Sequence, residues 1–257
     1  MTDNPNGNVS LQYTDNGIAT INFYHPAQNS LPSALLSLLA DKIDEAGKNA
    51  QTRVIVLKSD GDRTYCAGAS FDELMQIKDK ETGKKFFSGF ANVINAMRKS
   101  PQIIIGRVQG KAVGGGVGLA AAADYCLATE AASVKLSELA IGIGPFVISP
   151  AVERKIGISA FAQLTIKATD FHSAQWAKEK GLYHEVYTDI NALDTAVDAL
   201  AEKLASYNPE ALTELKKILV AGTENWDELL AERAAVSGEL VLSEFTQQAL
   251  HNFLNKK

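Results

Sequence analysis

Apolar and polar residues alternate in two short segments near the start of the chain, residues 9–13 and 18–23. Asp15, Asn16 and Gly17 lie between them. An Asn-Gly pair supplies the positive φ angles that a tight turn needs, so the pattern predicts an antiparallel β-hairpin.

The apolar spacing then changes to that of a helix. After Pro32, the residues Leu35, Leu38, Leu39 and Ile43 fall on one helical stripe, and a β-branched run follows at residues 54–57. The same order repeats, with helical spacing at residues 84–98 and a second apolar run at residues 103–105. Because strands and helices alternate, we expect a layered α/β fold.

From about residue 159 the apolar spacing is helical almost throughout. It is interrupted by Gly181-Leu182, by a short run at residues 185–187 that is typical of an edge strand, and by Asn208-Pro209. We therefore expect an α/β core over residues 1–195 and a helical region over residues 196–257.

Composition excludes several classes of protein. The 257 residues hold 25 Lys and Arg against 30 Asp and Glu, a net charge of −5 without a block of like charge, which argues against a nucleic-acid partner. No His or Cys spacing is typical of a metal site. The longest apolar stretch, around residues 117–123, is far shorter than the roughly 20 residues of a membrane-spanning helix, so we expect no membrane partner. Two cysteines among small apolar residues, and a polar N-terminus, favour the reducing cytoplasm.

Two segments of very small residues carry the candidate chemistry. Residues 65–71 and 110–118 each follow a predicted strand and open onto a helix. Helix N-termini present unpaired N–H groups that stabilise an anion. Two such ends that meet would form an oxyanion hole, which suits a thioester whose carbonyl oxygen gains negative charge as an enolate.

Several segments, in this order and spacing, make the chain similar to one known family. They are His25-Pro-Ala-Gln-Asn-Ser-Leu31, Tyr65-Cys-Ala-Gly-Ala69, residues 108–116, Asp124, Leu136-Ser-Glu138 with Gly142 and Pro145, and Ala177 with Gly181-Leu182. From about Leu11 onward the sequence resembles the crotonase (enoyl-CoA hydratase/isomerase) superfamily. Residues 136–150, with Arg154 and Ile156-Gly157, resemble its bacterial 3-methylglutaconyl-CoA hydratase-like branch.

The resemblance implies a fold and an assembly. The fold would be the crotonase (ClpP-like) spiral of ββα units with a C-terminal helical trimerisation region. The protein would form a homotrimer or a dimer of trimers. Its substrate would be an acyl-CoA thioester, without a separate cofactor.

The resemblance also implies positions for the site. The oxyanion donors would be the N–H groups of Ala69 and Gly115. The substrate would lie along a set of residues that share this cleft and the C-terminal tail: Gln28, Ser30, Ala67, Gly114, Gly118, Phe146, Phe253 and Lys256.

The chain departs from the common hydratase pattern at two of these positions. The first of two glutamates that position water in such enzymes is Gly118 here, whereas the second matches Glu138. Phe146 stands where the family has glycine and should narrow the acyl pocket. Glu138 would be the acid and base, with a pKa kept useful by the apolar neighbours Leu136, Leu139 and Ile141.

Four functions remain open on this basis. The favoured one is a hydratase-like lyase that acts on a short or branched 2-enoyl-CoA. A single glutamate also suffices for a Δ3,Δ2-enoyl-CoA isomerase, and a β-carboxylate could leave through the same enolate in a decarboxylase. The missing first glutamate also permits a non-catalytic acyl-CoA-binding subunit.

Overall fold

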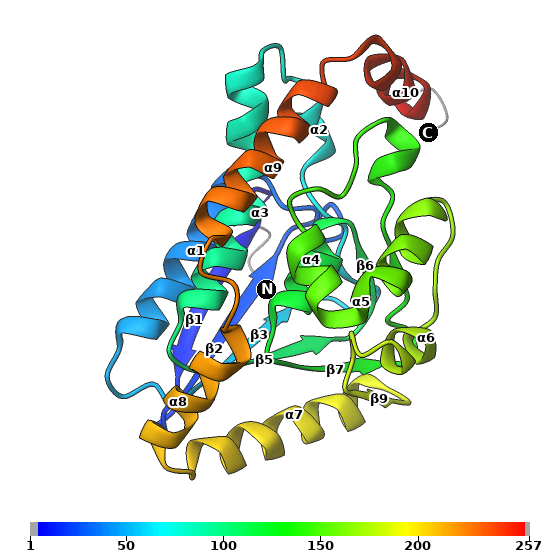
Figure 1. The fold of residues 1–257 in the computed structure, drawn as a ribbon. Coiled ribbons are helices and arrows are strands. Elements are labelled where there is room, and N and C mark those ends of the chain that lie inside the picture. The colour runs from blue at the N-terminus through cyan, green and yellow to red at the C-terminus, as the bar shows by residue number, and fades with distance from the viewer. Residues whose placement is uncertain (1–4, 255–257) are drawn as a thin grey trace.

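A six-stranded β-sheet forms the centre of the computed structural model, which describes residues 5–254. Its strands lie in the order β1-β2-β3-β5-β7-β9, and all neighbours are parallel except the antiparallel pair β1 and β2 (Figure 1). The strands are β1 (Asn8–Tyr13), β2 (Ile18–Tyr24), β3 (Val54–Ser59), β5 (Ile103–Val108), β7 (Tyr125–Thr129) and β9 (Glu185–Tyr187). The predicted α/β fold, its N-terminal hairpin and the edge strand β9 are confirmed.

The hairpin turn differs from the prediction in its detail. Only Gly17, with φ of 85°, has a positive φ angle in this turn, and Asn16 does not. The N–H of Gly17 donates to the carbonyl of Thr14, and the N–H of Ile18 donates to the Thr14 hydroxyl. A loop that contains one glycine in the left-handed region therefore replaces the expected two-residue turn.

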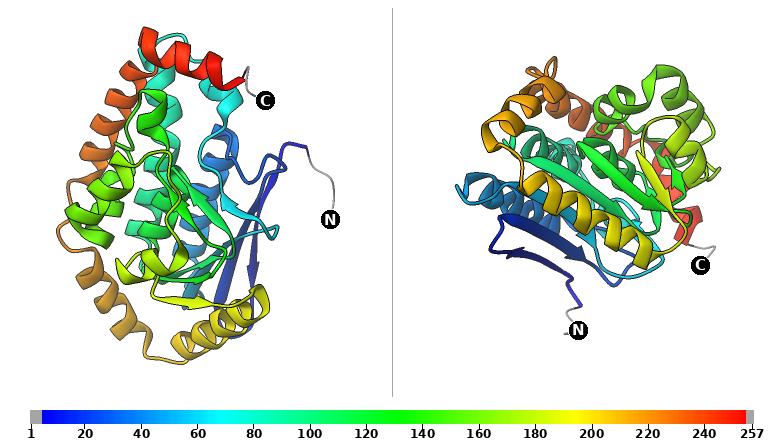
Figure 2. Two further views of the ribbon diagram at one scale, coloured as in Figure 1. Left: turned by 90° about the vertical axis from the view of Figure 1, so that its right-hand side faces the viewer. Right: turned by 90° about the horizontal axis from the view of Figure 1, so that it is seen from below.

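Helices cover both faces of the large sheet. Ile55 and Leu57 of β3 pack in one core with α1 (Ser33–Lys48) and α3 (Lys80–Lys99), whereas Val54 and Val56 pack in another with α7 (Ile190–Ala205). Alternate residues of a strand point to opposite faces, so the two groups of helices lie on opposite sides. Figure 2 shows α7 crossing the strands.

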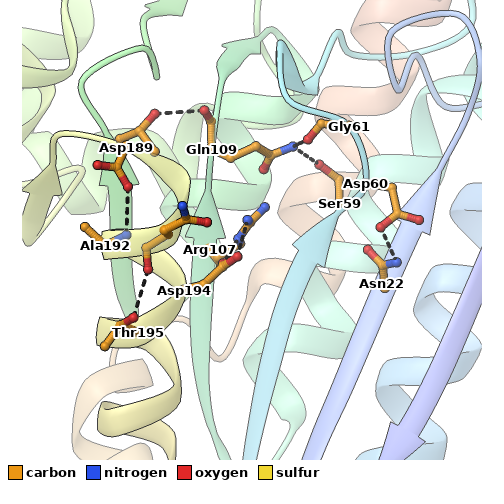
Figure 3. Close-up of polar contacts among 12 residues, drawn as sticks. Asn22, Ser59, Asp60, Gly61, Arg107, Gln109, Asp189, Ala192, Asp194 and Thr195 are labelled. Carbon is orange, nitrogen blue, oxygen red and sulfur yellow. Dashed lines mark hydrogen bonds and ion pairs between the residues drawn. The ribbon is translucent and has the colours of Figure 1, made fainter.

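Polar contacts fix α7 on its face of the sheet. The guanidinium of Arg107, only 6% exposed, donates through Nε to Asp194 Oδ1 at 2.6 Å and through its terminal nitrogen to Oδ2 at 3.0 Å (Figure 3). The carboxylate of Asp189 accepts from the N–H of Ala192 at the start of the helix.

The expected boundary between the α/β core and the C-terminal helical region, at residues 195 and 196, falls within α7. This boundary stays a prediction.

A second sheet of three short parallel strands was not predicted. Its strands, in the order β4-β6-β8, are β4 (Thr64–Cys66), β6 (Lys111–Val113) and β8 (Val134–Lys135). We expected each glycine-rich segment to follow a strand of the large sheet directly. Instead, the two segments include β4 and β6 of the small sheet and continue from their ends. Because β4 and β6 pair side by side, with Thr64 opposite Lys111, the small sheet places both segments at one edge.

The remaining helices lie around this sheet and along α3. They are α2 (Phe71–Leu74), α4 (Gly115–Ala122), the 3₁₀ helix η1 (Glu138–Ile141), α5 (Ser149–Ile166, kinked at Gly157), α6 (Ala174–Glu179), α8 (Pro209–Val220), α9 (Trp226–Leu240) and α10 (Glu244–Leu254). In Figure 1, α9 runs beside α3. The predominantly helical part of the chain therefore begins with α5 at Ser149, about ten residues before the expected position.

Candidate active site

The two glycine-rich segments meet at the N-terminus of α4. A Cβ atom added to Gly68 would lie 3.6 Å from the N atom of Gly115, and one added to Gly116 would lie 2.4 Å from the carbonyl oxygen of Cys66. Gly68 also has φ of 89°, a conformation that L residues rarely adopt. Glycine is therefore needed at position 68 for its backbone conformation and at position 116 because the two backbones are in contact there.

Two amide groups at this junction have no acceptor. Neither the N–H of Ala69 nor that of Gly115 donates a hydrogen bond within the described residues. The first turn of α4 leaves the N–H of Gly115 free, because the helix has no earlier carbonyl to accept it. The Ser30 hydroxyl donates to the carbonyl of Ala69 at 2.9 Å, and the N–H of Leu31 donates to that of Gly68 at 2.7 Å. Residues 30 and 31 thus hold the first segment in place.

Both segments line a cavity of about 770 Å³, counting space open to solvent. Glycine and apolar residues make up most of its wall. The lining residues are Ala67, Gly68, Ala69, Phe71, Leu74, Phe86, Phe87, Phe90, Val113, Gly114, Gly115, Ser137, Glu138, Ile141, Ile143, Gly144, Pro145, Phe146, Val147, Ile148 and Ser237. An apolar cavity that holds few polar groups is typical of a small-molecule site.

Glu138 is the ionisable residue of this wall. It begins η1, and its carboxyl group lies against Gly114, where an added Cβ would be 2.9 Å from Oε1. The residue is partly exposed, but its Oε2 atom is buried and has no hydrogen-bond partner. Burial raises the pKa of Glu138 to about 7, against the lowering effect of the backbone N–H groups of Glu138 and Ser137.

The apolar environment of Glu138 differs in one respect from the sequence prediction. Leu136 is fully buried and Ile141 lines the cavity, but the Leu139 side chain is 48% exposed. In the single turn of η1, successive side chains point in different directions, so Leu139 turns away from the cavity when Glu138 faces it. Ser137, next to Glu138, also lines the cavity, and its side chain makes no capping hydrogen bond to η1.

Gly118 does not line the cavity. A Cβ atom at this position would lie 2.5 Å from Cγ2 of Ile148, which is itself a lining residue. Ile148 therefore lies between Gly118 and the cavity and fills the space in which a side chain at position 118 would lie.

Phe146 lines the cavity, as the prediction of a narrowed pocket requires. Its ring lies against Gly144, where an added Cβ would be 2.4 Å from Cζ. Phe90 lies equally close to Gly115, at 2.3 Å from such an atom. Sequence reasoning missed Phe90 and also Ser237, because helical spacing of α3 and α9 gives no sign of which face reaches the glycine-rich segments.

Two predicted substrate contacts at the N-terminal side lie outside the cavity wall. Gln28 is exposed, and its amide oxygen accepts from the Thr64 hydroxyl at 2.9 Å; Ser30 holds the carbonyl of Ala69, as described above. Between them, Asn29 is 3% exposed, and its amide nitrogen donates to the carbonyls of Asp60 and Thr64. Gln28 and Asn29 have positive φ angles of 57° and 54°. Asparagine tolerates a positive φ better than most residues, so Asn29 was the residue in the sequence that could have indicated this turn.

Two further predictions concern the C-terminus. Phe253 belongs to α10, but its side chain and all of Lys256 lie outside the described part of the chain.

Residues 5–254 contain no group of His, Cys, Asp and Glu side chains arranged to hold a metal ion. None of the helices in that range is both long and apolar enough to cross a bilayer.

Comparison with known proteins agrees with this geometry. Residues 13–257 match the family model described as enoyl-CoA hydratase/isomerase. The chain is 28% identical to a "Probable enoyl-CoA hydratase" of Bacillus subtilis, covering 95% of this chain and 94% of that protein. It is 29% identical to the mitochondrial methylglutaconyl-CoA hydratase of Mus musculus, over 77% of this chain and 63% of that protein.

A solved structure extends the likeness to three dimensions. The crystal structure of an enoyl-CoA hydratase from Mycobacterium avium superposes with a TM-score of 0.86 at 27% identity, covering 97% of this chain and 96% of the other. The family match spans nearly the whole chain, and the fold is shared as well. The chain therefore belongs to the enoyl-CoA hydratase/isomerase family of enzymes, within the crotonase superfamily.

Proposed function

We propose that this enzyme adds water to a short or branched 2-enoyl-CoA through an oxyanion-stabilised enolate. The observation that carries the proposal is the position of the Glu138 carboxyl group, with its unpartnered Oε2, in the same cavity as the free N–H groups of Ala69 and Gly115. These are the two parts that enolate chemistry needs: a base of suitable pKa, and donors for the thioester oxygen.

The reaction balances with these groups alone. Ionised Glu138 takes a proton from water while the water oxygen bonds to C3, and the electron pair of the double bond moves onto the thioester oxygen. The N–H groups of Ala69 and Gly115 donate to that oxygen. The enolate then collapses, and C2 takes the proton from Glu138, which returns to its ionised form. The thioester is the substrate, and no separate cofactor takes part in these steps.

The relatives support hydration, because the Bacillus and Mus proteins named above are both called hydratases. The rest of the substrate path is part of the same proposal. Ala67 and Gly114 would lie next to the thioester, and the backbone near Gln28 and Ser30 would receive the pantetheine arm. Phe253 and Lys256 would lie near its nucleotide end.

One observation favours a second candidate, Δ3,Δ2-enoyl-CoA isomerisation. Ile148 fills the space at Gly118, so Glu138 is the single carboxyl group among the described residues of the cavity wall. A single carboxylate is sufficient to remove a proton from C2 and return it to C4 through the same enolate, without water.

Incubation with crotonyl-CoA and 3-hexenoyl-CoA in oxygen-labelled water separates the two reactions by mass spectrometry. Labelled oxygen in the product of crotonyl-CoA establishes hydration, whereas a shifted double bond without the label establishes isomerisation. The control is Glu138→Gln, which should bind the thioester but give neither product. If neither thioester is converted, both candidates are contradicted. Release of carbon dioxide in a further incubation with a carboxylated thioester would then favour a decarboxylase, and binding without any turnover would favour a non-catalytic subunit.

The assembly and location are proposed on the same terms. A homotrimer or a dimer of trimers would cover apolar side chains that α5 and α8 expose in the single chain, including Ile158, Ile166 and Ile218 at 64%, 74% and 70%. Sedimentation of the purified protein measures the assembly. Cytoplasmic location stays a prediction from the sequence.

A further inference from the structure

The charge of the cavity wall restricts the acyl group. Among its described residues, Glu138 is the single ionisable one. No Lys, Arg or His of the described chain contributes to that wall, and its other polar side chains are the hydroxyls of Ser137 and Ser237. Five phenylalanines make up much of the remainder: Phe71, Phe86, Phe87, Phe90 and Phe146.

Several lysines lie close to the wall along the chain but do not contribute to it. Lys84 and Lys85, which directly precede Phe86 and Phe87, are exposed and do not line the cavity. Lys135 lies three residues before Glu138, but its Nζ lies 4.4 Å from the ring centre of Phe171, which is not a lining residue. Lys111 of the neighbouring strand lies over the same ring at 5.2 Å. Lys80, at the start of α3, pairs with Glu239 at 2.8 Å on the surface, where its side chain is 71% exposed.

An anionic acyl group would therefore meet no cation among the described residues of this cavity wall. A carboxylate loses hydration in an apolar cavity, and only a cation or several hydrogen-bond donors would offset that loss. It would also be repelled by Glu138 whenever that group is ionised, as the proposed reaction requires. Phenylalanine rings, in contrast, favour a hydrocarbon chain.

We infer that the enzyme accepts an uncharged hydrocarbon acyl group and discriminates against one that ends in a second carboxylate. The inference rests on the proposed function and narrows its substrate class. It separates this chain from a relative whose name specifies methylglutaconyl-CoA, a carboxylated substrate, although residues 136–150 resemble that branch. It also argues against decarboxylation of a carboxylated thioester at this site.

Two matched substrates test the inference in the wild-type enzyme. Pent-2-enoyl-CoA and glutaconyl-CoA differ only by a methyl group in place of a carboxylate at the end of the acyl chain. We expect kcat/KM to be at least about 100-fold higher for pent-2-enoyl-CoA, the ratio that corresponds to a difference of about 2.7 kcal/mol. Equal or faster turnover of glutaconyl-CoA would overturn the inference.

A binding measurement keeps this test independent of turnover. The saturated thioesters pentanoyl-CoA and glutaryl-CoA cannot be hydrated, and calorimetry gives the Kd of each. Tighter binding of pentanoyl-CoA supports the uncharged acyl group even if no enoyl thioester is converted, an outcome that would refute only the proposed hydration. Equal or tighter binding of glutaryl-CoA refutes the inference whatever the turnover.

A cation introduced into the wall should weaken the preference for an uncharged acyl group. Phe87, on α3, is a partly exposed lining residue, so a longer charged side chain there has room to reach water. Phe87→Arg should raise the ratio of glutaconyl-CoA to pent-2-enoyl-CoA turnover at least about tenfold, equivalent to about 1.4 kcal/mol. The matched neutral variant Phe87→Met should leave the ratio near the wild-type value. If Phe87→Arg does not fold, the two thioester pairs in the wild-type protein still decide.

Discussion

The side chain of Ile148 occupies the place of a side chain at Gly118. A Cβ atom at position 118 would lie 2.5 Å from Cγ2 and 2.8 Å from Cβ of Ile148. The glycine of α4 and the isoleucine that precedes α5 are therefore complementary in volume. A glutamate at position 118 would therefore overlap Ile148 unless that side chain moved.

This complementarity predicts a pair of stability effects. Gly118→Glu should destabilise the fold by about 2 kcal/mol or more, because it overpacks a fully buried contact and brings in a charge. Gly118→Glu combined with Ile148→Ala should recover part of that loss. Urea denaturation of the two variants and of Ile148→Ala alone measures the coupling. Additive effects would show that Ile148 does not fill this space.

A second prediction concerns the glycine that lies against the carboxyl group. Gly114 has φ of 55°, and an alanine Cβ there would approach Oε1 of Glu138 to 2.9 Å. Gly114→Ala should therefore displace Glu138 and lower kcat on the order of 100-fold, the effect of a misplaced reacting group. Gly61→Ala is the matched control, because Gly61 also has a positive φ, 86°, but no atom lies within 4 Å of its added Cβ.

Both glycine variants should lose about 1–2 kcal/mol of stability or more, because an L residue rarely adopts a positive φ angle. Only Gly114→Ala should lose activity beyond that. Initial rates on crotonyl-CoA, with unfolding curves for both proteins, separate the two effects. A similar loss of rate in Gly61→Ala would mean that backbone strain, and not contact with Glu138, explains the result.

The sequence predicts the elements whose periodicity is long enough to be recognised. The hairpin, α1, α3 and the β-branched strands β3 and β5 were foreseen, because each shows several turns or alternations of apolar residues. The small sheet was not, since strands of two or three residues such as β8 (Val134–Lys135) carry no period. That sheet brings the two glycine-rich segments together. Apolar periodicity gave no sign of this, and the sequence suggested it only because an oxyanion hole would need two helix N-termini that meet.

The candidate site was foreseen unevenly for related reasons. Ala69, Gly115 and Glu138 do line one cavity, although their proposed roles await experiment. The exposure of Leu139 and the position of Ile148 in front of Gly118 depend on tertiary packing, which one sequence does not reveal. Phe90 was expected only as part of a buried helical face, yet its ring lies against Gly115.

A buried ion pair joins α8 to the core and gives a third prediction. Nζ of Lys216 lies 2.6 Å from Oδ2 of Asp124, with side-chain exposures of 3% and 7%, and it also donates to the carbonyl of Met97. Lys216→Met should destabilise the protein by about 3–5 kcal/mol, because it leaves a buried carboxylate without its cation. The double variant with Asp124→Asn should lose less than the sum of the single changes.

The adjacent surface pair is the control for this measurement. Lys217 and Glu214 are also 2.6 Å apart, but their side chains are 66% and 68% exposed. Lys217→Met should change stability little, since solvent screens an exposed pair. Thermal unfolding of the Lys216 and Lys217 variants compares them directly, and equal losses would contradict the importance of burial.

The raised pKa of Glu138 predicts how activity depends on pH. Hydration requires this carboxyl group to be ionised at the start, and burial places its pKa at about 7. The value of kcat/KM should therefore rise as pH increases through about 7 and then level off. Glu138→Gln should abolish turnover at every pH, whereas Glu153→Gln, at an exposed position on α5, should keep both the rate and its profile. A wild-type profile without an inflection near pH 7 would show that Glu138 is not the base.

The same pKa predicts an opposite trend in stability. A carboxyl group with a folded-state pKa of about 7 and an unfolded value of 4.5 holds its proton more tightly in the folded protein between these two values. The contribution of Glu138 to the free energy of unfolding should therefore be largest below about pH 4.5. It should fall by on the order of 3 kcal/mol as the pH rises through about 7. Glu138→Gln removes the ionisation, so this variant should be more stable than the wild type near pH 8 and differ little near pH 5. Urea denaturation at both pH values tests this prediction, and it measures the effect of the raised pKa of Glu138 without any substrate. Equal stability of the two proteins near pH 8 would show that burial does not raise the pKa of Glu138 in the free enzyme.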